Sequence, residues 1–274
     1  FDEESNIKWS KRMQEEGVNV IFGVEGLKIH SKLLYVKTTK GDIACVGTGN
    51  FHEGNARVYT DYLMMTARQG IVAEVAKVFD FIDRPFSPMR FKELLVSPNS
   101  MKTRVMRLFD TEIKNAQEGK PAWVKIKINH ITDPDIVNKM YAASRAGVRI
   151  EALVRGNCSL VPGIPGLSDN IRIVGIIDRY LEHSRILIFC NNDRPRYFLG
   201  SADWMPRNLV GRIEVMAPAY DDDLKRDLLR TVDYGLRDNA NGRIVDGHGT
   251  NEIQPVKEGE KPFRSQEELH KAYS

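Results

Sequence analysis

Two stretches of sequence decide the fold: residues 30–36 read HSKLLYV, and residues 183–189 read HSRILIF. At the same offset of 153 residues, GTGNF at 47–51 aligns with GSADW at 200–204. The offset also aligns Asp61 with Glu214. A duplicated histidine, followed two residues later by a cation, predicts one active site built from two related halves.

Strand and helix patterns surround both copies of this motif. Residues 33–36 and 43–46 predict a hairpin, and residues 70–82 place apolar side chains at helical spacing. Residues 221–234 predict the corresponding helix of the second half. Strands and helices also alternate between residues 123 and 154, which is typical of α/β architecture. We therefore expect two halves, each a mixed β-sheet flanked by helices.

A linker divides the chain. The segment at 84–88 reads RPFSP and ends the preceding helix, so we predict domains at residues 1–93 and 94–274. Arg155 ends a predicted strand 28 residues before His183, and the matching place in the first half falls near residue 2. We therefore expect the first half to be incomplete at its N-terminus and the chain to be a fragment.

Two further segments carry structural expectations. Residues 18–22 read VNVIF and predict a buried strand. From about residue 236 the chain is polar, charged and rich in glycine, so we expect a loosely ordered tail.

Composition indicates an ordinary soluble globular protein. The 274 residues are 42% hydrophobic and 28% charged, and no apolar run approaches the ~18 residues of a membrane span. The three cysteines, Cys45, Cys158 and Cys190, form no Cys-x-x-Cys motif. This cysteine usage predicts a reducing, cytoplasmic location, with peripheral membrane association left open. The net charge of +3 does not indicate a nucleic-acid partner.

The paired histidines suggest phosphoryl transfer. A neutral imidazole is a competent nucleophile near pH 7, and a covalent phosphohistidine divides a difficult transfer into two steps. One histidine, His30 or His183, would attack while the other supplies a proton. Asp61 and Glu214 each follow a histidine by 31 residues and are candidates to orient the two rings.

Cations and hydrogen-bond donors accompany each histidine. Lys32 and Arg185 lie two residues after the histidines, so on a strand they share the histidines' face. There they would hold phosphoryl oxygens. Asp203 would either bind a metal or orient a cation, and the sequence leaves both roles open. Candidate hydrogen-bond donors to the same oxygens are Thr48, Asn50 and Ser201.

Several motifs in order resemble the bacterial polyphosphate kinases that have phospholipase D-like C-terminal domains. The matching stretches are IHSKL at 29–33, GTGNF at 47–51, YTDY at 59–62, LVRG at 153–156, DRYLEH at 178–183 and SADWM at 201–205. The phospholipase D superfamily itself usually has an acid seven residues after each histidine. Here those positions hold Lys37 and Cys190.

The resemblance implies a reversible transfer of the terminal phosphate of ATP to inorganic polyphosphate, with Mg²⁺ as cofactor. It implies that His30 is autophosphorylated, that His183 assists, and that Tyr59 and Arg155 contact ATP. Ser201 and Asp203 belong to the same expected phosphate-binding set. Arginines linked to magnesium in this family precede the first histidine, and the nearer one matches a position before Phe1, so the metal-binding residues stay unknown. The expected partners are ATP, ADP and polyphosphate, with a homo-oligomer for the full-length protein.

Two alternative functions stay open. A phospholipase D-like phosphodiesterase or nuclease would use the same histidine intermediate on a diester. A non-catalytic polyanion-binding fragment would bind polyphosphate without forming phosphohistidine, which suits an incomplete first half.

Overall fold

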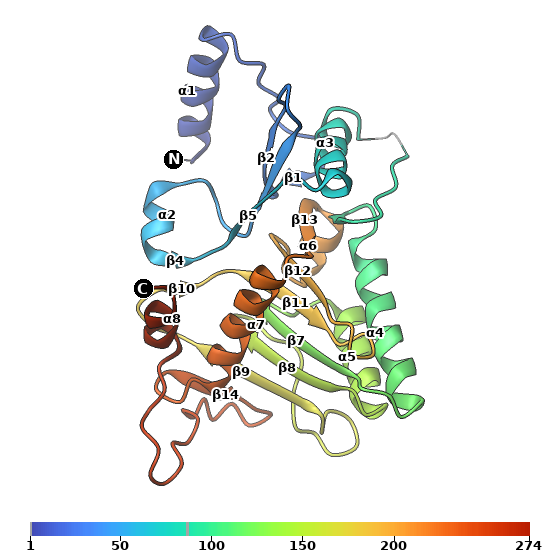
Figure 1. Ribbon diagram of the computed structural model, residues 1–274, viewed down its shortest axis with the longest axis vertical. Helices are drawn as coiled ribbons and strands as arrows, with labels where there is room; N and C mark the ends of the chain where they lie inside the picture. The colour runs from blue at the N-terminus through green and yellow to red at the C-terminus, as the bar shows by residue number, and fades with distance from the viewer. Residues whose placement is uncertain (1, 86–87) are drawn as a thin grey trace.

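A nine-stranded mixed sheet forms the centre of the second half (Figure 1). The computed structural model describes residues 2–85 and 88–274. The strand order is β1-β13-β12-β11-β7-β8-β9-β14, and β6 pairs with β13 beside this path. The bounds are β1 (Lys28–Ile29), β6 (Leu95–Ser97), β7 (Trp123–Ile128), β8 (Arg149–Val154), β9 (Ile171–Ile176), β11 (Arg185–Phe189), β12 (Arg196–Gly200), β13 (Arg212–Ala219) and β14 (Gly242–Val245).

Helices cover both faces of this sheet. Helices α4 (Met101–Gln117) and α5 (Pro134–Arg145) pack one apolar cluster against it, with Phe109 and Met140 fully buried. Helices α3 (Gln69–Asp83) and α7 (Asp222–Arg237) share a second cluster on the other face. Because α3 belongs to the first half and α7 to the second, the two halves share a hydrophobic core. The expected mixed α/β architecture with flanking helices is confirmed.

The first half has a smaller sheet of three antiparallel strands in the order β2-β3-β5. Strands β2 (Lys32–Val36) and β3 (Ile43–Gly47) lie 153 residues before β11 and β12, with identical lengths. The repeat seen in the sequence is therefore a repeat of structure. The remaining elements are α1 (Asp2–Glu15), α2 (Glu53–Val58), β4 (Tyr59–Thr60), β5 (Leu63–Thr66), β10 (Leu181–Glu182), α6 (Pro206–Val210) and α8 (Ser265–Tyr273).

Each half contributes a short strand that pairs with a strand of the other half. Strand β1 pairs in parallel with β13, and β10 pairs in parallel with β4. The exchange is reciprocal, because the amide of Ser31 donates to the carbonyl of Ile213, and that of Ser184 donates to the carbonyl of Thr60, both at 2.9 Å. These pairings bring the segment before each histidine against the opposite half.

One face of the smaller sheet is open to solvent. Leu34 and Met65 are 48% and 68% exposed, whereas Leu187, which matches Leu34 in the repeat, is fully buried beneath helices of the second half. Among the described residues, the first half has no counterpart of β7, β8, α4 and α5. Residues 2–15 form α1, and this helix precedes the strands of the first half.

Two expectations were wrong. Residues 18–22 form no strand, and Phe22 is 72% exposed, because no neighbouring strand offers this apolar stretch a partner. The tail beyond residue 236 is not loose, since it forms β14 and α8 and is tied to the second half by buried hydrogen bonds. Within residues 2–85 and 88–274, no helix has both the length and the apolar character to cross a bilayer.

Candidate active site

The two histidines are paired with carboxylates across the halves. Nδ1 of His30 lies 2.9 Å from both carboxylate oxygens of Glu214, and Nδ1 of His183 lies 2.9 Å from both oxygens of Asp61. Asp61 and Glu214 therefore face the two rings as expected, but each faces the histidine of the other half. The reciprocal strand exchange explains this crossing, because it brings each histidine against the opposite half.

The two imidazoles differ at their second nitrogen. A carboxylate only accepts hydrogen bonds, so Nδ1 of each ring carries the proton and Nε2 carries the lone pair. In His183 this lone pair already faces the guanidinium of Arg185, with Nη1 at 3.1 Å from Nε2. No hydrogen bond to Nε2 of His30 is found in the described part of the chain. His30 therefore has the nitrogen that is available for attack.

Hydrogen bonds from within its own half fix Glu214, which is fully buried. Ser201 Oγ donates to Oε2 at 2.5 Å, and Asn208 Nδ2 donates to Oε1 at 2.7 Å. Both carboxylate oxygens are thus held while they face His30. The offset of 153 residues aligns Asn208 with Asn55 of the first half.

Asp61 is held by a hydroxyl group and by a close glycine. Thr48 Oγ1 donates to Asp61 Oδ1 at 2.6 Å. A Cβ atom at Gly49 would come within 1.9 Å of the Asp61 carboxylate, so only glycine leaves room for it. Burial would raise the pKa of Asp61, but hydrogen bonds from His183 and Thr48 lower it overall. Asp61 therefore stays ionised beside its histidine.

Burial dominates the ionisation of His183. Its pKa is lowered chiefly by burial, and Arg185 and Arg155 lower it further, whereas the hydrogen bond with Asp61 raises it. The ring is therefore neutral near pH 7, as an acceptor at Nε2 must be. It also packs against Tyr59, with ring centroids 4.8 Å apart.

Lys32 is a buried cation on the face shared with His30. Its ammonium group donates to the backbone carbonyl of His30 rather than to the ring. Burial lowers the pKa of Lys32 to about 8, with Arg185 and Arg212 adding to the effect and Glu214 and Asp61 opposing it. The expected cation is thus present at the backbone of His30, and with a pKa of about 8 it loses its charge at mildly alkaline pH.

Arg185 joins the two halves at the centre of the site. Its Nη2 lies 3.1 Å from Asp203 Oδ2, and its Nη1 donates to the carbonyl of Thr48 at 3.2 Å and to that of His183 at 2.6 Å. Of the two roles left open for Asp203, the structure shows the orientation of a cation. Burial would raise the pKa of Asp203, but Arg185 lowers it overall.

Arg155 is the third cation of the site. Its Nε donates to Asn129 Oδ1 at 2.7 Å, and the backbone amide of Asn129 donates to Asp203 Oδ1 at 2.9 Å. Burial lowers the pKa of Arg155, and the charge of Arg185 lowers it further. Because the positive charges of Arg155 and Arg185 repel each other, we expect the space beside them to favour a bound anion.

The remaining sequence candidates divide into buried and exposed residues. Ser201 is fully buried and acts on Glu214, so it does not face a free phosphate oxygen. Asn50 is exposed at the turn that follows β3. Sequence reasoning missed Asn129 and the ion pair between Lys127 and Glu182 at 2.9 Å. The repeat gave no signal for Lys127 or Asn129, because the described residues of the first half include no counterpart of β7.

Magnesium has no ready-made protein site here. The described residues contain no group of three or more His, Cys, Asp or Glu side chains that could hold a metal ion. The carboxylates of Asp61, Asp203 and Glu214 already face His183, Arg185 and His30, respectively. The expected cofactor therefore remains a prediction.

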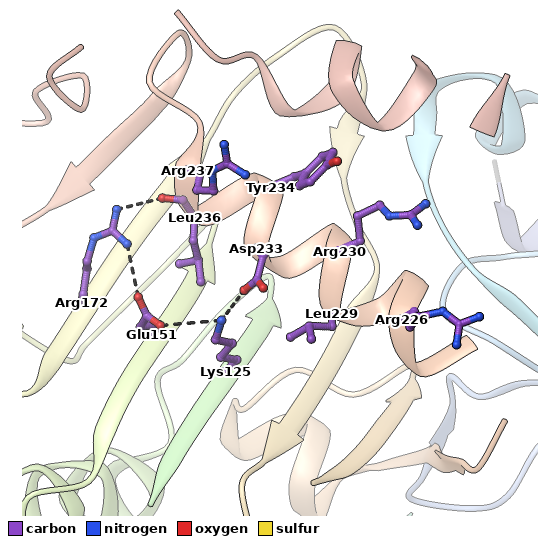
Figure 2. A pocket seen from close by; sticks show the side chains of 10 residues that line it. All are labelled: Lys125, Glu151, Arg172, Arg226, Leu229, Arg230, Asp233, Tyr234, Leu236 and Arg237. Atoms are coloured by element: carbon purple, nitrogen blue, oxygen red, sulfur yellow. Dashed lines mark hydrogen bonds and ion pairs between the residues drawn. The ribbon is translucent and has the colours of Figure 1, made fainter. Parts of the chain in front are cut away.

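A separate pocket lies between α7 and the strands β7, β8 and β9 (Figure 2). Its walls include Lys125 and Arg172, which face Asp233 and Glu151 (Figure 2). Neither histidine pair lines it. The inner cations of this pocket are matched by carboxylates, and the pocket is separate from the histidine site.

Comparisons with known proteins agree on one family. Residues 1–88 match the model for polyphosphate kinase C-terminal domain 1, and residues 94–266 match that for polyphosphate kinase C-terminal domain 2. A polyphosphate kinase from Vibrio cholerae is 48% identical over 256 residues, which are 92% of this chain and 36% of that protein. The one from Escherichia coli K12 is 46% identical over 259 residues, which are 93% of this chain and 38% of that protein.

A solved structure gives the same result. The crystal structure of polyphosphate kinase from Porphyromonas gingivalis superposes with a TM-score of 0.90 at 37% identity, over 98% of this chain and 42% of that one. This chain thus spans well under half the length of the relatives that it matches. Its two matched segments together cover nearly all of its residues, and the chain belongs to the polyphosphate kinase family.

Proposed function

We propose that this chain carries the catalytic centre for a reversible transfer of the ATP γ-phosphate to inorganic polyphosphate, through a phosphohistidine at His30. The observation that supports it most is the free Nε2 lone pair of His30, whose Nδ1 is fixed by Glu214 at 2.9 Å. The names of the relatives supply the substrate class.

In the first step, Nε2 of His30 attacks the γ-phosphorus of ATP. The new N–P bond forms as the bond between the γ-phosphorus and the bridging oxygen breaks, and ADP leaves. Positive charge develops on the imidazole, and the buried carboxylate of Glu214 stabilises it through Nδ1–H. The second step reverses this order: a terminal oxygen of polyphosphate attacks, and the N–P bond breaks.

The cations of the site would hold the transferring group. Burial lowers the pKa values of Lys32 and Arg155, and the positive charge of Arg185 lowers both further, so Arg185 lies near each of them. Phosphoryl transfer depends mostly on such positioning and charge stabilisation. In this proposal His183 handles a proton on the nucleotide or polyphosphate side, with Asp61 fixing its ring. Tyr59 and Asn50 contact ATP and phosphate, and Mg²⁺ accompanies the nucleotide.

The test is incorporation of labelled phosphate into the full-length protein. With ATP labelled at the γ-position, we expect acid-labile, alkali-stable label, and mass spectrometry should locate it at His30. His30→Ala should abolish it, whereas His248→Ala, at an exposed loop position, should label like the unmodified protein.

Three outcomes would overturn the assignment. Label that persists in His30→Ala would place the intermediate elsewhere. Hydrolysis of a chromogenic phosphodiester without ATP would favour the phosphodiesterase alternative instead. Binding of polyphosphate with no phosphohistidine at all would favour the non-catalytic alternative.

A further inference from the structure

The C-terminal helix α8 is anchored by a buried carboxylate. Asp238, which is fully buried at the end of α7, accepts hydrogen bonds from the backbone amide and the hydroxyl of Ser265, both at 2.7 Å. Figure 1 shows α8 beside β10 and β4, the strand pair that precedes the His183–Asp61 contact. The tail thus returns to the site after leaving the large sheet.

An ion pair fixes the start of α8 to the segment before His183. Arg264 reaches Asp178 through Nε at 2.9 Å and Nη2 at 2.5 Å. The Asp178 side chain is only 2% exposed. The hydrogen bonds from Arg264 hold the pKa of Asp178 below its ordinary range.

Both the oxygen and the nitrogen of the Gln266 side-chain amide form hydrogen bonds with the same segment. Its Oε1 accepts from the backbone amide of Tyr180 at 3.0 Å, and its Nε2 donates to the Tyr180 carbonyl at 2.8 Å. The same Nε2 donates to Glu182 Oε1 at 2.6 Å. Gln266 therefore fixes both the backbone and the side chain of the residues that lead into His183.

Glu182 passes this constraint to the other half. Its Oε2 lies 2.9 Å from the ammonium group of Lys127 and 3.2 Å from Thr60 Oγ1. Thr60 Oγ1 in turn accepts from the backbone amide of His183 at 3.2 Å. Thr60 directly precedes Asp61, so the chain of contacts ends on both members of the His183–Asp61 pair.

The far end of α8 contacts the first half directly. Tyr273 Oη lies 3.2 Å from Tyr62 Oη, which also lies 2.6 Å from Thr231 Oγ1. Tyr62 directly follows Asp61. The two ends of α8 thus contact the segments that carry His183 and Asp61. The support for Glu214 comes from Ser201 and Asn208 instead.

We infer that α8 acts as a clamp that holds His183 against Asp61. Gln266 and Arg264 are then positioning residues for the His183–Asp61 pair and not for His30. The geometric inference stands on these contacts, and its catalytic consequence rests on the proposed function. The clamp would hold the assisting histidine in place while leaving the nucleophilic one independent of the tail.

Hydrogen exchange in the full-length protein tests the clamp without reference to activity. In Gln266→Met, which keeps the bulk and removes the hydrogen bonds, we expect faster exchange in peptides covering 178–184 and 59–66. Peptides covering 28–36 and 212–219, around His30 and Glu214, should not change. The control is Lys271→Ala on the exposed side of α8, whose ion pair is with Glu268, and it should leave all four peptides unchanged.

Graded variants separate positioning from general destabilisation. Gln266→Glu should increase hydrogen exchange around His183 more than Gln266→Met does, because it removes a donor and places a second carboxylate beside Glu182. Arg264→Lys should retain part of the protection that Arg264→Ala loses. Equal exchange in Gln266→Met and the unmodified protein, or an equal increase around His30, would contradict the clamp.

Kinetics supply the second measurement. We expect Gln266→Met to lower kcat by about 10- to 100-fold with little change in KM for ATP, because a small displacement of an acid–base group is that costly. In Gln266→Met, water that enters around His183 would reduce its burial and so raise its pKa. The charges of Asp61, Arg185 and Arg155 would still act on the ring. The acid limb of the rate should therefore move to higher pH.

The two proposals fail separately. If the unmodified protein forms no phosphohistidine, the proposed function fails, while the exchange measurement still decides whether α8 is a clamp. If His30 is phosphorylated but Gln266→Met keeps its kcat and its acid limb, the positioning role is wrong and the function stands.

Discussion

At the scale of single residues, the site depends on which nitrogen is left unoccupied. The two histidines are equivalent in the sequence, and each faces a carboxylate through Nδ1. They become different because Arg185 is long enough to reach Nε2 of His183, whereas Lys32 turns to the backbone carbonyl of His30. A lysine in one copy and an arginine in the other thus leave Nε2 accessible in only one of the two histidines, which is the difference that the proposed function uses.

The Lys32 ammonium group predicts an alkaline limit to the proposed reaction. Its pKa of about 8 means that its charge, and its attraction for phosphate, fades above that pH. Lys32→Arg should move this limit upward, because arginine keeps its proton beyond pH ~12. The pH dependence of phosphate incorporation measures the shift. Lys37→Arg, at an exposed position, is the control, and an alkaline limb that does not move in Lys32→Arg would rule out Lys32 as its source.

At the scale of elements, the matched strands β3 and β12 end in glycines with different surroundings. A Cβ at Gly200 would meet the backbone of β13, 2.0 Å from the carbonyl oxygen of Val215. A Cβ at Gly47 would lie 3.2 Å from the Cβ of Lys32 and 3.3 Å from the carbonyl oxygen of Gly49, which is a much milder approach. The same residue type therefore has a stricter packing role in the second half.

This difference predicts unequal effects of alanine on stability. Gly200→Ala should lower the free energy of unfolding by about 2–3 kcal/mol, because backbone atoms in a sheet cannot move aside easily. Gly47→Ala should have a clearly smaller effect. Urea denaturation of the two variants and the unmodified protein measures both changes, and comparable losses would show that the halves are equally tightly packed.

At the scale of the whole molecule, the halves form one site because they exchange strands. The pairings β1–β13 and β10–β4 place each histidine in the other half. A substitution in one half should therefore change the ionisation of the histidine that comes from the other half.

Asp61→Asn tests this coupling through the ionisation of His183. The carboxylate of Asp61 raises the pKa of His183 against the effect of burial, so removing its charge should lower that pKa further. Histidine-selective NMR titration measures it, with the matched variant Glu214→Gln expected to leave the His183 titration in place. A shift of His183 in Glu214→Gln but not in Asp61→Asn would mean that each carboxylate serves the histidine of its own half.

The amino-acid sequence was enough to predict the repeat and the α/β architecture. These follow from local patterns, because strand alternation, helical spacing and a fixed offset are all visible along the chain. The offset also matched strands β2 and β3 with β11 and β12 residue by residue.

Which carboxylate contacts which histidine became clear only in the folded chain. The crossing of Glu214 to His30 and of Asp61 to His183 depends on strand pairing between segments more than 120 residues apart, and no local pattern encodes it. The tail was misjudged for the same reason: its polar composition suggests disorder, yet Asp238, Arg264 and Gln266 each have a specific partner. A polar segment is ordered when its charges and amides are matched in space, and that matching exists only in the folded chain.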